Sequence, residues 1–261
     1  MKEELKAAFV NRSFLLAFAV ILLCLMGFSL PTFISSLDWG EFAPSALHLS
    51  IGGIFFGGVM LLLPFCASVP YATSQVDEIR TAFMQWKVLR GSIPRYSLSK
   101  ILATAASGAS AVALAFLVNA VIWNLLGAPI DPVANTSHEL VFADGCMYNE
   151  WYKIAHGLPM YLSMALGIFV SSAVWATVGL AVAVWVPDRL LCITIPACLY
   201  YLWSAGLFRF LFGWYLPPPS ALFNDALTWQ IVRQSLGIYA LLFMLAVGVY
   251  IAGLKRRVQH A

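Results

Sequence analysis

Six long apolar stretches divide this chain of 261 residues, and they limit its fold more than any other feature. They cover approximately residues 13–34, 47–71, 101–126, 157–186, 190–212 and 231–254. Because a helix rises ~1.5 Å per residue, ~20 residues cross the ~30 Å hydrocarbon core of a bilayer, and each stretch is long enough. None contains Asp, Glu or Lys, whose burial near the bilayer centre costs ~2.5–3.5 kcal/mol. We therefore predict an all-α membrane protein with six transmembrane helices.

The composition leaves no room for a separate soluble domain. Hydrophobic residues make up 61% of the chain and charged residues 10%, far from the usage of soluble globular proteins. We expect one transmembrane domain over residues 1–261. The sequence also lacks a phosphate-binding G-x-x-x-x-G-K-[ST] loop, a nucleophile elbow and an acidic residue within a span. These absences argue against an enzyme, and no feature of the chain suggests nucleic-acid binding.

The charges are sorted between the two sides of the predicted membrane domain. With a cytoplasmic N-terminus, 12 of the 15 basic residues fall on the inner side. They are Lys2, Lys6, Arg12, Arg80, Lys87, Arg90, Arg95, Lys100, Arg189, Lys255, Arg256 and Arg257. Basic residues near span ends resist translocation, so this bias orients the chain. It predicts that both termini are cytoplasmic, whereas the inverted orientation would require all of these residues to cross.

The only sizeable inner loop, residues 72–100, contains an amphipathic segment. Val76, Ile79, Phe83 and Trp86 recur at three- and four-residue spacing, which predicts one helix over residues 74–89. Ser74 is the expected N-cap, and Gly91 and Pro94 are expected to end the helix. The composition allows two interpretations equally. The helix either rests on the inner leaflet or docks onto a soluble partner.

Two further features concern helices. Leu5, Phe9 and Val10 oppose charged residues at the N-terminus, which predicts an amphipathic helix that anchors at the membrane interface. Small residues recur at four-residue spacing in the second and third spans and predict close helix packing. They are Gly53, Gly57, Ala103, Ser107 and Ala111.

The longest outer loop, residues 127–156, carries residue types that bind metals. They are His138, Asp144, Cys146 and His156. Neither C-x-x-C nor H-x-x-x-H spacing is present, so we predict no metal site. The cysteines in apolar segments are expected to act as small hydrophobic residues, and Cys146 has no predicted disulfide partner on its side.

Several short motifs around the second and third spans occur together. They are Pro70-Tyr71-Ala72, Asp77-Glu78, Arg90, Arg95-Tyr96 and Ser99-Lys100, followed by the small-residue third span. With them, and with Leu5-Lys6-Ala7-Ala8-Phe9 before the first span, the chain resembles the membrane subunits of ABC-2-type ABC transporters, especially the compact six-span permeases of Gram-positive bacteria. Thr81-Ala82 replaces the Ser-Gly pair that is common in that family.

The resemblance implies a function and partners. The 74–89 helix would be a coupling helix that docks onto a cytoplasmic ABC ATPase subunit, which binds ATP and Mg, while this chain holds no cofactor. The coupling residues would be Asp77, Glu78, Arg80, Phe83, Trp86 and Arg90. A second permease subunit, identical or related, would complete a dimer in the bacterial cytoplasmic membrane, with the first, second and fifth spans bordering the pathway. Export of an amphiphilic or hydrophobic peptide, lipid-like molecule or drug is expected, including resistance to antimicrobial peptides.

Two functions from other classes remain open. A membrane anchor or sensory subunit that transports nothing would have similar spans, and an ATPase gene beside this chain would argue against it. An integral membrane enzyme is disfavoured, because no catalytic constellation is evident.

Overall fold

The computed structural model describes residues 2–36, 45–55, 59–81, 83–90, 92–128, 158–204, 206 and 229–259. Over these ranges the secondary structure is α-helix, with turns between helices and no strand, which confirms the predicted all-α class. The helices are α1 (Lys2–Phe9), α2 (Arg12–Ser36), α3 (Ala46–Phe55), α4 (Val59–Ser68), α5 (Ala72–Arg80), α6 (Phe83–Arg90), α7 (Ile93–Leu125), α9 (Leu158–Trp185), α10 (Arg189–Ser204) and α12 (Trp229–Gln259).

Five helical segments in the described ranges are long and apolar enough to cross a membrane. They are Arg12–Ser35, Val59–Arg80, Ile93–Leu125, Tyr161–Trp185 and Val232–Gln259. The first and last of these are only 22% buried within the chain, and they expose large apolar side chains such as Leu23 and Leu241. Soluble monomers rarely expose this much apolar surface. The chain therefore has the architecture of a multi-pass membrane protein.

The second and fifth predicted spans differ most from their helices. Where one helix is predicted over residues 47–71, the structure has the short helices α3 and α4, and residues 56–58 between them lie outside the described ranges. α10 has 16 residues, which at ~1.5 Å per residue give about 24 Å, less than the hydrocarbon core. The remainder of the predicted 190–212 span, apart from Gly206, also lies outside the described ranges.

The third predicted span begins earlier than expected. α7 starts at Ile93, within the predicted inner loop, rather than at residue 101. Pro94 lies in its first turn, where the missing backbone N–H interrupts no helical hydrogen bond. Proline was expected to separate the loop helix from the span, but here it lies inside the long helix, and this places Lys100 on α7.

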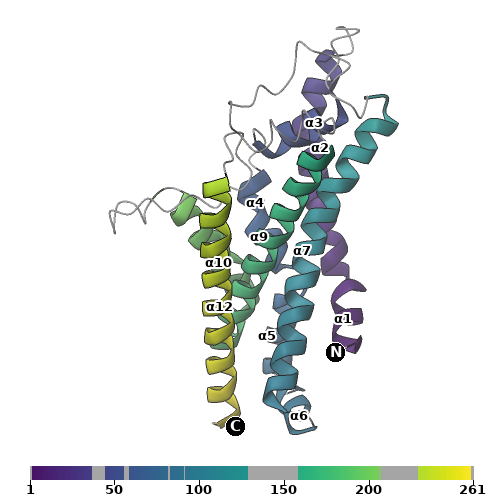
Figure 1. The fold of residues 1–261 in the computed structure, drawn as a ribbon. Coiled ribbons are helices and arrows are strands. Elements are labelled where there is room, and N and C mark those ends of the chain that lie inside the picture. The colour runs from purple at the N-terminus through teal and green to yellow at the C-terminus, as the bar shows by residue number, and fades with distance from the viewer. Residues whose placement is uncertain are drawn as a thin grey trace.

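α9 is the central helix of the bundle. It packs against α7 on one side and α12 on another, and it also contacts α4, α5 and α10. Figure 1 shows α1, α6 and the C-terminal end of α12 near the same end of the bundle, with α3 toward the opposite end. We call the end that carries Lys2, Phe83–Arg90 and Gln259 the termini end.

The small residues singled out in the sequence lie at helix contacts. A Cβ on Gly53 would lie 2.8 Å from Ser29 Oγ of α2, so α3 and α2 approach closely. Ala103, Ser107 and Ala111 are fully buried on α7. Gly57 lies outside the described residues. The nearest approach of this kind is at Gly108, beside Ser107, where a Cβ would lie 2.7 Å from Ala176 Cβ and even closer to the carbonyl oxygen of Ala67.

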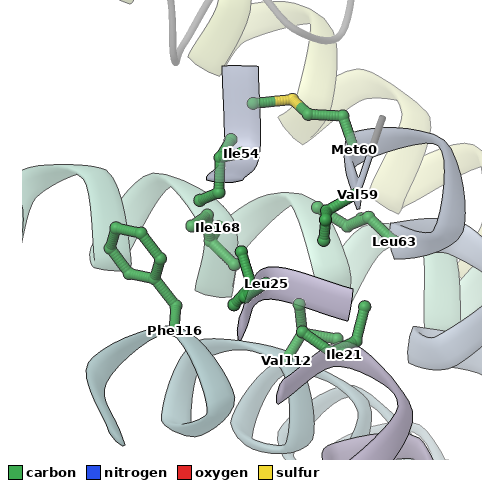
Figure 2. A pocket seen from close by; sticks show the side chains of 9 residues that line it. All are labelled: Ile21, Leu25, Ile54, Val59, Met60, Leu63, Val112, Phe116 and Ile168. Carbon is green, nitrogen blue, oxygen red and sulfur yellow. The ribbon is translucent and has the colours of Figure 1, made fainter. Parts of the chain in front are cut away.

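A small apolar cavity lies inside the bundle, where α3 and α4 meet α2, α7 and α9. Figure 2 shows nine side chains around it: Ile21, Leu25, Ile54, Val59, Met60, Leu63, Val112, Phe116 and Ile168. Its volume is about 20 Å³, room for roughly one water molecule. A site lined by hydrocarbon gives water no hydrogen-bond partner, so this cavity is dry. It cannot serve as a passage for a polar molecule.

Candidate functional site: a buried charged cluster at the termini end

The predicted loop helix over residues 74–89 is two helices, so its prediction as one was wrong. α5 begins at Ala72 and ends at Arg80, and α6 begins at Phe83. Ser74 is not the N-cap. It lies within α5, where its hydroxyl donates to the carbonyl oxygen of Tyr71 at 2.8 Å. At the other end, the Thr81 hydroxyl donates to the carbonyl oxygen of Asp77 at 2.8 Å, a local bond that competes with continued helix.

Four charged side chains from four helices meet at this end of the bundle, and two of them come from α5 and α6. They are Glu4 of α1, Glu78 of α5, Lys87 of α6 and Lys100 of α7, and we call them the charged cluster. The Lys100 ammonium lies 2.9 Å from Glu78 Oε1 and 3.7 Å from Glu4 Oε2. Lys87 Nζ lies 2.9 Å from Glu78 Oε1 and also contacts Glu4. Two carboxylates thus face two ammonium groups, and the cluster is neutral.

Lys100 is the most deeply buried member of the charged cluster. Its side chain has no exposed surface, while those of Glu78 and Glu4 are 12% and 13% exposed. Its ammonium also donates to the Ser74 hydroxyl at 2.8 Å and lies 4.2 Å from the centre of the Tyr71 ring. A buried ammonium is tolerated only when carboxylates and further hydrogen-bond partners replace water. Lys100 has both.

Tyrosine hydroxyls and one amide extend the cluster toward α12. Tyr96 donates to Glu78 Oε2 at 2.6 Å and lies 3.0 Å from Gln75 Oε1. The same amide oxygen accepts a hydrogen bond from Tyr250 of α12 at 3.3 Å. The Tyr71 hydroxyl donates to Glu4 Oε2. The network therefore joins α1, α5, α6, α7 and α12 at one end of the bundle.

Helix geometry explains why Tyr96 and Lys100 act together. Residues four apart lie on the same face of an α-helix, so both side chains project from α7 toward α5, where they reach the two oxygens of the same carboxylate, Glu78. Starting α7 at Ile93 is what brings Tyr96 into this helical register. The motif Tyr-x-x-Ser-Lys, residues 96–100, is thus a carboxylate-binding face of one helix.

The cluster shifts the titration of the groups that lie on α1 and α6. Burial alone would raise the pKa of the Glu4 carboxyl, but the charge of Lys100 and the hydrogen bonds from Lys87 and Tyr71 outweigh it and hold the pKa below its usual value. For Lys87, burial opposes the charged form, yet hydrogen bonds to Glu4 and Glu78 raise the pKa above its usual value. Both groups are charged at neutral pH.

The Glu4 shift predicts how the attachment of α1 responds to pH. Because its pKa is lower in the folded protein, Glu4 stabilises the attachment above its unfolded pKa of about 4.3, and this stabilisation is lost as pH falls through the folded pKa. A fluorophore on Glu3→Cys, in a cysteine-free background in lipid nanodiscs, should show constant anisotropy from about pH 8 to 5 and lower anisotropy below about pH 4. Glu4→Gln should lower the anisotropy already at neutral pH. Release of α1 near pH 6–7 would contradict this assignment.

Two exposed ion pairs tie the outer side of α5 to the turn between α9 and α10. Arg189 donates to Asp77 Oδ1 from Nη2 at 2.6 Å and from Nε at 2.9 Å. Arg80 lies 3.9 Å from Asp188 and donates to the carbonyl oxygen of Pro187 at 3.2 Å. Exposed pairs of this kind contribute only ~0–1 kcal/mol each. These two pairs therefore contribute little to the stability of the α5 position.

α6 has an exposed aromatic side and a buried aliphatic side. Phe83 and Trp86 are 51% and 61% exposed. Met84 and Val88 are buried with Tyr96 and Leu254. Among the predicted coupling residues, Glu78 is buried in the charged cluster, Asp77 and Arg80 form half-exposed ion pairs, and Phe83 and Trp86 are exposed aromatic residues. The side chain of Arg90 lies outside the described residues.

Sequence reasoning missed Glu4, Lys87 and Lys100 as partners. The one available signal was Lys100, a charge at the border of an apolar span, which demands a counter-charge. The described residues contain no group of His, Cys, Asp and Glu that could hold a metal ion, while His138, Asp144, Cys146 and His156 lie outside them. Comparison with protein-family models, with curated proteins and with solved structures finds no significant match for this chain.

Proposed function

We propose that this chain is the permease subunit of an ATP-driven ABC transporter in a bacterial cytoplasmic membrane. In this proposal the termini end is cytoplasmic, and α6 docks onto a separate ATPase subunit. A second permease subunit, identical or related, completes the transporter. Its cargo is an amphiphilic or hydrophobic molecule, such as a peptide, a lipid-like compound or a drug, and the direction is export.

The observation that carries the proposal is the attachment of α6. Its exposed side offers two large aromatic side chains, Phe83 and Trp86. Beside them lies Lys87, whose ammonium is 5.0 Å from the centre of the Phe83 ring and joins α6 to the bundle, because it contacts Glu4 of α1 and Glu78 of α5. A force applied to the aromatic side is therefore passed to α1, α5 and α7 together. This is the requirement for a coupling element, since rigid helices transmit the closure of ATPase subunits as movements of whole bodies.

The resemblance seen in the sequence gains a physical basis from the charged cluster. Tyr71, Glu78, Tyr96 and Lys100 come from four of the short motifs that resemble those of the permease family. They are scattered over 30 positions of the chain, yet their side chains contact one another. Motifs that carry no chemistry on their own are thus explained as parts of one structural joint beside α6.

The proposal includes a separate ATPase because the sequence of this chain shows no nucleotide-binding motif. Its sequence lacks a phosphate-binding glycine loop with the following Lys and Ser or Thr. ATP and Mg would be bound by the partner. We expect the purified chain to copurify with an ABC ATPase encoded beside it and to hydrolyse no ATP alone.

The small size of the internal cavity favours a cargo pathway between two permease subunits over one inside a single subunit. At about 20 Å³ and with a hydrocarbon lining, it has no room for a cargo molecule. A pathway between two chains would instead be bordered by the outer surfaces of the spans, where the described helices expose large apolar side chains. Such a path suits amphiphilic or hydrophobic cargo.

The docking test uses the exposed aromatic side of α6. The double variant Phe83→Ala and Trp86→Ala should lower copurification of the ATPase at least tenfold, because buried aromatic anchors dominate interface energies. The matched control is Leu126→Ala, which removes a side chain of similar exposure, 53%, at the C-terminal end of α7. It should leave recovery unchanged. Both proteins should elute as monodisperse particles from size-exclusion chromatography.

Equal recovery of the ATPase with the double variant and the control would contradict docking through α6. The lipid-anchor interpretation predicts a different pattern. The double variant would then weaken protection of α6 by the bilayer, measured by labelling of a cysteine at Gln85, without changing ATPase recovery.

A further inference from the structure

Two neighbouring hollows lie along α12 near the termini end, and they share one side chain, Trp185. The first is a groove of about 270 Å³ between α9, α10 and α12. Its lining is entirely apolar: Val178, Ala181, Val182, Trp185, Val186, Ile195, Leu199, Leu242, Leu245, Ala246 and Val249. The second is a hollow of about 310 Å³ lined by Val184, Trp185, Gly253, Arg256 and Arg257. The apolar groove and the cationic hollow are therefore neighbours that share Trp185 as a wall.

The cationic hollow has fixed walls. Trp185 Nε1 donates to the carbonyl oxygen of Val249 at 3.1 Å, so the indole lies against α12. Gly253 allows this approach, because a Cβ there would lie 2.7 Å from Trp185 Nε1. Arg257 donates to the carbonyl oxygens of Val184 and Trp185, the latter at 3.2 Å, and so satisfies the C-terminal end of α9. The arrangement is held by hydrogen bonds rather than by loose side chains.

Arg256 supplies a cation that has no carboxylate partner among the described residues. Its side chain is exposed, its guanidinium lies 5.6 Å from the centre of the Trp185 ring, and it forms no ion pair with a described carboxylate. α12 itself contains no acidic residue. A guanidinium with free N–H donors binds phosphate oxygens in a bidentate manner. The hollow is therefore complementary to a phosphate group.

The spacing of the two hollows matches one leaflet of a bilayer. On α12 the lining runs from Leu242 to Arg257, about 22 Å at ~1.5 Å per residue. One leaflet including its headgroup region is about 20–22 Å thick, half of the ~40–45 Å bilayer. Trp185, at the junction, belongs to the residue type that favours the headgroup level. Acyl chain and headgroup would each meet the surface that suits them.

We propose that these two hollows form a binding site for one anionic phospholipid, with an acyl chain in the apolar groove and the phosphate at Arg256. The site requires only that α9 and α12 span the bilayer, and it is independent of the transport proposal. Its occupant would strengthen the contact between α9, α10 and α12 at the termini end.

The experiment measures phosphatidylglycerol that remains bound to the full-length protein after extraction from bilayers of phosphatidylcholine and phosphatidylglycerol, by native mass spectrometry. Wild-type protein should retain phosphatidylglycerol over phosphatidylcholine. Arg256→Gln should lower retention about fivefold, as expected for loss of one basic contact to anionic lipid. Lys255→Gln removes the same charge from an adjacent exposed position that does not line the hollow, and it should change retention less than twofold.

A second pair of variants tests the groove. Val249→Trp fills the groove and should abolish preferential retention, whereas Leu241→Trp, on α12 outside the lining, should not. Equal loss with Arg256→Gln and Lys255→Gln would show diffuse attraction to an anionic surface and would overturn the proposal. Unchanged retention by Val249→Trp would also overturn the proposal. A change in oligomer mass with this variant would show instead that the groove contacts a second copy of the chain.

Discussion

Lys100→Met is expected to destabilise the protein by about 3–5 kcal/mol, the usual consequence of removing one partner of a buried ion pair. The methionine fits the volume, but Glu78 and Glu4 then keep two buried negative charges with Lys87 as their only lysine in the cluster. The loss should appear as a lower thermal midpoint and a much smaller monodisperse fraction in fluorescence-detected size-exclusion chromatography. Membrane targeting should remain, since the apolar spans are unchanged.

A matched variant separates burial from charge. Arg80→Met also removes a basic partner from α5, but the Arg80–Asp188 pair is 54% and 47% exposed, so its loss should cost less than about 1 kcal/mol. Adding Glu78→Gln to Lys100→Met restores neutrality and should recover part of the stability, a coupling that a double-mutant cycle measures. If Lys100→Met cost no more than Arg80→Met, the cluster would not be a buried network.

The long spans were predictable because hydrocarbon imposes a length and excludes charge. α2 and α9 begin and end within two residues of their predicted bounds. The division of the second span was not predictable, because its apolar composition is the same whether the helix is continuous or divided into α3 and α4. Pro64 does not mark the division, because it lies inside α4. The start of α7 was misplaced for a related reason, since proline in the first turn and proline after a helix look alike in sequence.

The cluster was predictable only in part. The spacing of Tyr96 and Lys100 is local and could be seen in the sequence. The contacts of Glu4 with Lys87 and of Gln75 with Tyr250 join residues 83 and 175 positions apart, and no local pattern specifies them. The resemblance treats the coupling residues as one set, but tertiary contacts give its members different surroundings. Glu78 is buried in the charged cluster, whereas Asp77 and Arg80 stay half exposed beside the exposed aromatic residues.

The second large effect is expected at Gly108, where α7 crosses α4 and α9. A Cβ there would contact the carbonyl oxygen of Ala67 and lie 2.7 Å from Ala176 Cβ. Neither neighbour is the end of a flexible side chain, so the helices themselves must separate. Gly108→Ala should therefore cost about 3 kcal/mol, the upper range for overpacking, and this exceeds the ~1 kcal/mol that alanine gains in helix propensity.

The control is Gly248→Ala on α12, where an added Cβ has nothing within 4 Å. Both changes add one methyl group to a helix, so any general effect of alanine on insertion or helix propensity is common to them. Gly248→Ala should leave the thermal midpoint unchanged or slightly raised, while Gly108→Ala should lower it markedly. Similar midpoints would mean that α4, α7 and α9 can separate at no cost. That result would contradict the close crossing at Gly108, and with it the rigid connection between α7 and the rest of the bundle that the coupling proposal requires.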